Sequence, residues 1–219
     1  MFDPNAPRKP YSAKGSNVAR CPACLMAEGY CLCAEKTPVT QASNEVHFCL
    51  LMHKEESYKP SNTGRLIEHI LPEYSHRYYW SRTEPDPDFI ALITSSKYQP
   101  YIIFPGDRGG YEDRVVDCAD QSSANIPLFI ILDGSWRQAG RMFRLSEYLQ
   151  NIPVLPLTTQ RHSEYRLRKV PDEFHLCTVE VAIELLHQHK QSSAGDVLDR
   201  YFKRFNELYA QSRRQQKPT

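Results

Sequence analysis

The feature that most constrains the fold is a continuous apolar run at residues 127–132, which reads PLFIIL. A strand that is apolar on both faces indicates a sheet covered on both sides, as in α/β proteins. Four further strand candidates lie at 46–52, 89–94, 101–104 and 152–157, and helical patterns separate several of them. Strands that alternate with helices predict an α/β fold with a mostly parallel sheet and flanking helices.

The helical patterns place apolar residues three or four positions apart, at 66–71, 179–186 and 198–209. This spacing puts them on one side of a helix, which indicates helices that pack against the sheet. Thr178 would cap the second helix, with Glu180 in its first turn.

Composition is that of a globular protein, since 41% of the 219 residues are hydrophobic and 24% are charged. The first 20 residues are polar and contain three prolines, which predicts a disordered basic arm rather than a signal peptide. No run approaches the roughly 18 apolar residues that a membrane span requires. We therefore expect a cytoplasmic protein without membrane contact, with a catalytic α/β domain at 41–212 and a basic tail at 213–219.

Four cysteines lie within thirteen residues, as Cys21, Cys24, Cys31 and Cys33. Two short pairs across a turn can bring four thiolates around one tetrahedral zinc ion. Because all four ligands would be cysteines, no position stays open for a catalytic water, so residues 21–40 are predicted to form a structural zinc knuckle. The alternative is a redox CxxC pair. Cys49, Cys118 and Cys177 are interpreted as ordinary thiols.

The apolar run at 127–132 ends in the corner Asp133-Gly134-Ser135-Trp136. Asp133 could be a general base, an orienting acceptor or the cap of the next helix. Gly134 permits the close approach of a ligand. Trp136 could stack on a base or fill the core. Ligands of α/β sheets sit beyond the carboxyl ends of strands, so this corner, residues 104–107 and the segment after 157 could line one pocket.

Basic residues follow this corner. Arg137, Arg141 and Arg144 fall on one stripe of the helix after Asp133. Four more basic residues follow within the next 25 positions, with His162 and Tyr165 between them: Arg161, Arg166, Arg168 and Lys169. Such a surface is typical of contacts with phosphates and a stacked base, although a solvated face would give the same charges.

Several motifs occur together along the chain. They are the four cysteines, KPSNTGR at 59–65, FPGD at 104–107, DGSW at 133–136 with Gln138 and Ala139, SEYRLR at 163–168 and CTVE at 177–180. With these motifs in this order, the sequence resembles the DTW-domain family of tRNA-uridine aminocarboxypropyltransferases. Ser135 stands where the family name records a threonine, and both residues offer a hydroxyl.

The resemblance implies transfer of the 3-amino-3-carboxypropyl group of S-adenosylmethionine to N3 of a uridine in tRNA, which leaves methylthioadenosine. It also implies a uridine in the variable loop, because bacterial members resemble enzymes that act there. The family is related to the SPOUT methyltransferases, so the expected fold is SPOUT-like and knotted. The oligomeric state stays open, with a monomer favoured.

The same resemblance assigns roles to residues. Asp133 is the catalytic residue, as base or as positioning acceptor. The residues expected to bind the cofactor are Phe104, Pro105, Gly106, Leu132, Gly134, Ser135, Trp136, Tyr165 and Thr178. Residues that face either RNA or the cofactor are His53, Asn62, Thr63 and Arg65, and Arg65 joins the basic residues above as an RNA contact. Two alternatives remain: a zinc-containing RNA-binding protein without catalysis, and a SPOUT-type RNA methyltransferase.

Overall fold

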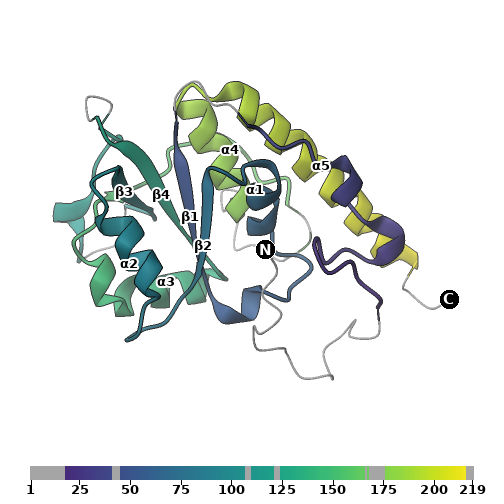
Figure 1. The fold of residues 1–219 in the computed structure, drawn as a ribbon, viewed down its shortest axis with the longest axis horizontal. Coiled ribbons are helices and arrows are strands. Elements are labelled where there is room, and N and C mark those ends of the chain that lie inside the picture. The colour runs from purple at the N-terminus through teal and green to yellow at the C-terminus, as the bar shows by residue number, and fades with distance from the viewer. Residues whose placement is uncertain are drawn as a thin grey trace.

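The computed structural model describes residues 18–40, 45–106, 110–120, 124–165, 167 and 176–215. At its centre is a five-stranded sheet in the order β2-β1-β4-β3-β5, in which every neighbouring pair is parallel (Figure 1). The strands are β1 (His47–Met52), β2 (Ser75–Tyr79), β3 (Tyr98–Ile103), β4 (Ile126–Asp133) and β5 (Val154–Leu155). The predicted α/β fold with a parallel sheet and flanking helices is therefore confirmed.

Helices cover both faces of the sheet (Figure 1). One face carries α1 (Gly64–Ile70), α4 (Thr178–Gln188) and α5 (Ser192–Gln215), and the other carries α2 (Pro87–Thr94) and α3 (Trp136–Leu145). Short 3₁₀ helices lie at Glu28–Tyr30, Cys33–Glu35, Lys54–Glu56, Glu112–Arg114 and Glu147–Leu149. Within the described part of the chain, no helix combines the length and the apolarity that crossing a bilayer would take.

The central strand β4 explains the continuous apolar run. Phe129 and Ile131 pack in the core beneath α4 and α5, while Leu128, Ile130 and Leu132 pack in the core beneath α2 and α3. Successive side chains of a strand point to opposite faces, so a strand buried on both sides has no polar alternation.

One strand prediction is wrong. Residues 89–94 belong to helix α2, because the Asp86 side chain accepts a hydrogen bond from the Asp88 N–H and Pro87 occupies the first turn. Phe89 and Ile93, four residues apart, are its buried face. A short apolar run fits a strand and a helix equally well. Strand β2 was missed because its sequence, SHRYY, is polar and half-buried at the sheet edge.

The connections after β1 and β4 diverge to opposite faces of the sheet. After β1 the chain passes to α1 on one face, and after β4 it passes to α3 on the other face, although β1 and β4 are neighbours. A parallel sheet opens into a crevice where neighbouring connections separate in this way. Asp133, the last residue of β4, lies at that point, paired in register with Met52 of β1.

The cysteine segment packs against helix α5 and shares the core of the α/β domain (Figure 1). Cys24, Met26 and Leu32 are buried in the same cluster as Phe202 and Phe205 of α5. At the other end, α5 continues to Gln215, so the first three residues of the predicted basic tail are helical. The predicted disordered arm lies outside the described residues except for residues 18–20.

The amino-terminal edge of the sheet holds a histidine pair. His47 is 3% exposed, and its Nδ1 lies 3.2 Å from Nε2 of His76. Glu45, Lys97 and Tyr98 also lie near His47, and the Tyr74 ring packs edge-on against it. Burial lowers the pKa of both imidazole rings below the ordinary value of 6.5. Both rings are therefore neutral in the folded protein at neutral pH.

We expect the free energy of unfolding to fall as the pH drops below 6.5. In that range the unfolded histidines bind protons before the folded ones do, which favours unfolding by up to about 1.4 kcal/mol per ring and pH unit. Urea unfolding at about pH 7.5 and about pH 5.5 measures this loss. A His76→Gln variant should lose less stability between the two pH values than the parent protein. An unchanged loss would show that the pair is not responsible.

Candidate active site

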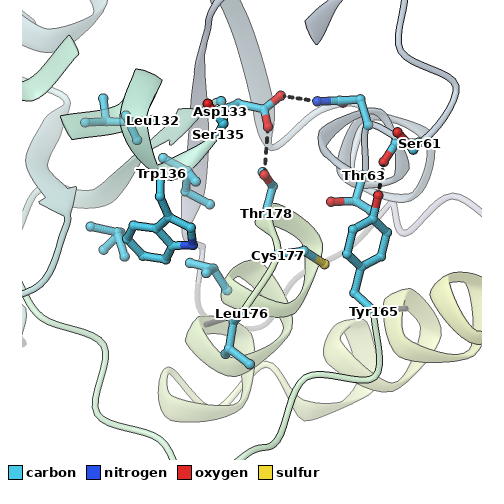
Figure 2. Close-up of a pocket in the computed structure, with 16 residues that line it drawn as sticks. Ser61, Thr63, Leu132, Asp133, Ser135, Trp136, Tyr165, Leu176, Cys177 and Thr178 are labelled. Atoms are coloured by element: carbon cyan, nitrogen blue, oxygen red, sulfur yellow. Dashed lines mark hydrogen bonds between the residues drawn. The ribbon is translucent and has the colours of Figure 1, made fainter. Parts of the chain in front are cut away.

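A pocket opens at the carboxyl end of β4 (Figure 2). Its walls come from the loop before α1, the end of β4 with the start of α3, and the start of α4. The polar and aromatic residues of these walls are Ser61, Asn62, Thr63, Asp133, Ser135, Trp136, Tyr165, Cys177 and Thr178. The remaining lining is mostly aliphatic: Ile103, Ile131, Leu132, Leu176 and Val181, with Gly134 and Ala139.

Asp133 is the buried anion of this pocket. Its carboxylate is 2% exposed and accepts hydrogen bonds from Thr178 Oγ1 to Oδ1 at 2.7 Å and from Asn62 Nδ2 to Oδ2 at 2.8 Å (Figure 2). Gly64 makes room for this carboxylate, since a Cβ there would lie 2.8 Å from Oδ2. The side chain is therefore fixed by two segments that are far apart in the sequence, residues 62–64 and Thr178.

Asp133 is not the cap of helix α3. Ser135 is the N-cap residue, and its Oγ accepts a hydrogen bond from the Gln138 N–H while the Gln138 side chain accepts one from the Ser135 N–H. This reciprocal pair satisfies the first turn of the helix. Of the three roles considered for Asp133, base and orienting acceptor therefore remain.

Aromatic side chains flank the pocket. The indole of Trp136 points into it rather than into a core cluster, and the ring of Tyr165 stands on the opposite side (Figure 2). The Tyr165 hydroxyl donates to the Ser61 carbonyl at 2.5 Å, which ties the segment before α4 to the loop before α1. Both rings can present apolar surface to a ligand.

The predicted loop 104–106 follows directly after Ile103, which lines this pocket. Phe104 is buried on the α3 side of the sheet, stacked on Phe143 with ring centroids 4.4 Å apart. Gly106 packs on Pro156, whose Cγ would lie 2.6 Å from a Cβ at Gly106. Phe104, Pro105 and Gly106 are not among the residues that line the pocket, and their contact with the cofactor stays a prediction.

The four predicted metal ligands converge. The Sγ atoms of Cys21, Cys24, Cys31 and Cys33 all lie within 4.8 Å of one another, with Cys21 to Cys33 at 3.7 Å and Cys24 to Cys31 at 3.8 Å. Four thiolates around one tetrahedral zinc ion, with Zn–S bonds of about 2.3 Å, stand about 3.8 Å apart. The donor set and its spacing therefore fit one tetrahedral metal ion.

Residues 18–210 match the DTW domain family, a range that contains the cysteines and the whole lining of the pocket. This chain belongs to the DTW domain family. It is also 26% identical, over 176 residues, to tRNA-uridine aminocarboxypropyltransferase 2 of Macaca fascicularis. The similar stretch covers 77% of this chain and 57% of that protein, so the chain spans less than two thirds of its relative's length. No solved structure matches.

The basic residues of this DTW domain fall into separate groups. Arg137, Arg141 and Arg144 are exposed along α3, the helix whose first residue is Trp136. Arg161 instead lies among acidic side chains, 2.5 Å from Asp199 and 3.5 Å from Glu184, and so stabilises the packing of α4 and α5. The predicted contacts at Arg166, Arg168 and Lys169 lie outside the described residues.

Arg65 is a correction to the predicted RNA contacts. Its side chain is 7% exposed and donates to the carbonyls of Ser57 and Lys59 at 3.5 and 3.0 Å. Burial lowers its pKa to about 10, although the nearby negative charges of Glu68 and Asp133 raise it in part. Arg65 therefore supports the loop that carries Asn62 from the inside of the DTW domain and does not reach a surface that RNA could touch.

Cys177 was interpreted as an ordinary thiol and in fact lines the pocket. It is the N-cap residue of α4, in place of the predicted Thr178, and pairs with Glu180 in a capping box. Burial, reinforced by Glu180, raises its pKa well above the ordinary value, so the thiol stays protonated. In the sequence, only its position immediately before Thr178, a predicted cofactor-binding residue, indicated that Cys177 could line the pocket.

Proposed function

We propose that this DTW-domain protein transfers the 3-amino-3-carboxypropyl group of S-adenosylmethionine to N3 of a uridine in tRNA, in the variable loop. The observation that carries the proposal is the buried Asp133 carboxylate, held by Asn62 and Thr178 at the wall of an otherwise largely apolar pocket. The similarity to a named tRNA-uridine aminocarboxypropyltransferase supplies the reaction class.

The reaction forms one bond and breaks one. The N3 nitrogen bonds to the γ-carbon of the methionine part, the bond from that carbon to sulfur breaks with its electron pair on sulfur, and methylthioadenosine leaves. The sulfonium charge is lost and the N3 proton is released to solvent, so atoms and charge balance. Three carbons bonded to the sulfonium are electrophilic, so the pocket selects one of them by positioning.

Asp133 is the residue we assign to this positioning. Thr178 donates to Oδ1 and Asn62 donates to Oδ2, and a carboxylate has about four acceptor sites in all. The carboxylate can therefore hold a substrate N–H group without losing its protein partners. The aliphatic lining and the indole of Trp136 suit the adenine ring and the carbon chain of the donor.

We further propose that the cysteine cluster binds one structural zinc ion. With four thiolate ligands the ion would hold residues 21–33 folded against α5 and take no part in transfer. The SPOUT relation and the knot stay predictions from the resemblance.

The exposed arginines of α3 are proposed as the tRNA surface, since they continue from the corner that carries Trp136. We expect an Arg141→Ala/Arg144→Ala double variant to bind tRNA about tenfold more weakly near 0.1 M salt. It should also show a shallower salt dependence, because two phosphate contacts are lost. Fluorescence anisotropy over a salt series measures both quantities.

The matched control for this double variant is Arg200→Ala, which removes an exposed arginine of α5. It should leave tRNA binding unchanged. Equal weakening by Arg200→Ala and by the double variant would contradict a specific role for α3.

The cellular test of the function is mass spectrometry of nucleosides from tRNA. A strain that lacks this protein should lack 3-(3-amino-3-carboxypropyl)uridine at its target position and regain it on complementation. An unchanged nucleoside content in the deletion strain would contradict the proposal.

A further inference from the structure

Asn62 occupies an unusual position between two buried carboxylates. The residue is 2% exposed, and its Nδ2 donates to Asp133 Oδ2 at 2.8 Å and to Glu56 Oε2 at 3.4 Å. Glu56 is fully buried and is itself held by Lys59 Nζ at 2.6 Å. Because an ionised carboxylate only accepts hydrogen bonds, both acids require the NH₂ side of the amide, so the orientation of Asn62 is fixed.

This orientation leaves the carbonyl oxygen of Asn62, a residue that lines the pocket, as an acceptor without a donor in the described part of the chain. Oδ1 is buried and has no hydrogen-bond partner among the described residues. It lies beside the Asp133 carboxylate, since a Cβ at Gly64 would be 3.3 Å from Oδ1 and 2.8 Å from Asp133 Oδ2. A buried acceptor without a partner costs free energy, and a native site that keeps one calls for an explanation.

The chemistry of this corner discriminates between possible ligand groups. Asn62 Oδ1 and Asp133 Oδ2 are both acceptors, so they match a group with several donors and no acceptor. A primary ammonium has three N–H donors and can bridge two oxygens. The imide of uridine has a single N–H between two carbonyl oxygens. These carbonyl oxygens would be repelled by the oxygens of Asn62 and Asp133. The corner therefore fits an ammonium better than a nucleobase edge.

We propose that Asn62 Oδ1, together with Asp133, binds the α-ammonium group of the aminocarboxypropyl donor, and that Glu56 is a positioning residue that fixes the Asn62 amide. The inference rests on the proposed function, since it assigns one part of the donor to one part of the pocket. Binding of the ammonium by the neutral Asn62 oxygen and the Asp133 carboxylate would fix the aminocarboxypropyl group, which contains the electrophilic carbon.

The test compares two unreactive ligands that differ in one group. S-adenosylhomocysteine carries the α-ammonium, and its deaminated analogue does not. We expect isothermal titration calorimetry to show that Asn62→Ala weakens binding of S-adenosylhomocysteine by about 10- to 100-fold, the range for a hydrogen bond to a charged group. Binding of the deaminated analogue should change by less than about threefold. The ratio of the two affinities is therefore the readout.

A second variant and a control keep the result decisive. Glu56→Gln keeps the size of the side chain and should lower the ratio of the S-adenosylhomocysteine affinity to the affinity of the deaminated analogue by about three- to tenfold. If Asn62→Ala does not fold, the result with Glu56→Gln decides the test. The matched control is Asn206→Ala, because Asn206 in α5 also has a buried Oδ1 without a partner in the described structure and lies outside the pocket lining. It should leave both affinities unchanged.

Two failures can be told apart. If the parent protein binds both ligands but Asn62→Ala weakens them equally, the ammonium assignment is overturned and the proposed function stands. If the parent protein binds neither ligand, the proposed function fails and the ammonium assignment fails with it.

Discussion

Asp133→Asn is expected to lower kcat/KM for aminocarboxypropyl transfer by about 10³-fold while tRNA binding stays within about twofold of the parent protein. Loss of one preorganised polar group in an active site reduces rates by about 10² to 10³. The effect here should lie at the upper end, because the amide carries no charge and can accept through only one oxygen, so at least one of the hydrogen bonds from Thr178 and Asn62 to the carboxylate is lost or reversed. A steady-state transfer assay and anisotropy with tRNA measure the two quantities.

Asp117→Asn is the control for this substitution, because Asp117 is exposed and lies outside the pocket. It should retain full transfer activity and full tRNA binding. A transfer rate of Asp133→Asn within about tenfold of the parent would contradict the assignment of Asp133 to the reaction. A parallel loss of tRNA binding would instead indicate a role in RNA contact.

Cys24→Ser is expected to remove most of the bound zinc and to lower the free energy of unfolding by at least about 3 kcal/mol. Metal binding at a four-cysteine site contributes directly to folding, and the loss of one ligand destroys the closed site. Cys24 is 1% exposed and belongs to the core cluster that includes helix α5, so damage should spread into the domain. Elemental analysis by mass spectrometry and urea unfolding measure these effects.

Cys118→Ser provides the comparison, since Cys118 is an exposed thiol outside the cluster. It should keep about one zinc ion per chain and its full stability. If Cys24→Ser kept the same metal content as Cys118→Ser, the zinc site would be wrong. A metal-free parent protein with unchanged stability would also contradict a structural role for the ion.

The parallel sheet could be predicted because β4 is buried on both faces and therefore has an unbroken apolar sequence. The same reasoning failed for 89–94, which is equally apolar but has a helix start at Asp86 and Pro87. It also failed for β2, where the edge position tolerates polar residues. Sequence patterns thus predicted the strand that is buried on both faces, and failed for helix α2 and for the edge strand β2, which are only partly buried.

The candidate site was predictable where chemistry lies next to a strand end, as at Asp133 and Trp136. The partners of Asp133 come from chain positions 71 residues before it and 45 residues after it, so only the fold brings Asn62 and Thr178 to the carboxylate. Charge alone did not indicate that Arg65 donates to backbone carbonyls or that Arg161 pairs with Asp199, because the sequence does not show the partners of an arginine. Glu56 carried no local signal at all.

The most direct measurement of the central claim uses S-adenosylmethionine labelled separately in the methyl group and in the aminocarboxypropyl group. The purified protein, incubated with tRNA, should transfer the aminocarboxypropyl label to RNA and release the methyl label in methylthioadenosine. Appearance of the methyl label alone in the RNA would contradict the account and identify a methyltransferase, and absence of both labels from the RNA would contradict catalysis.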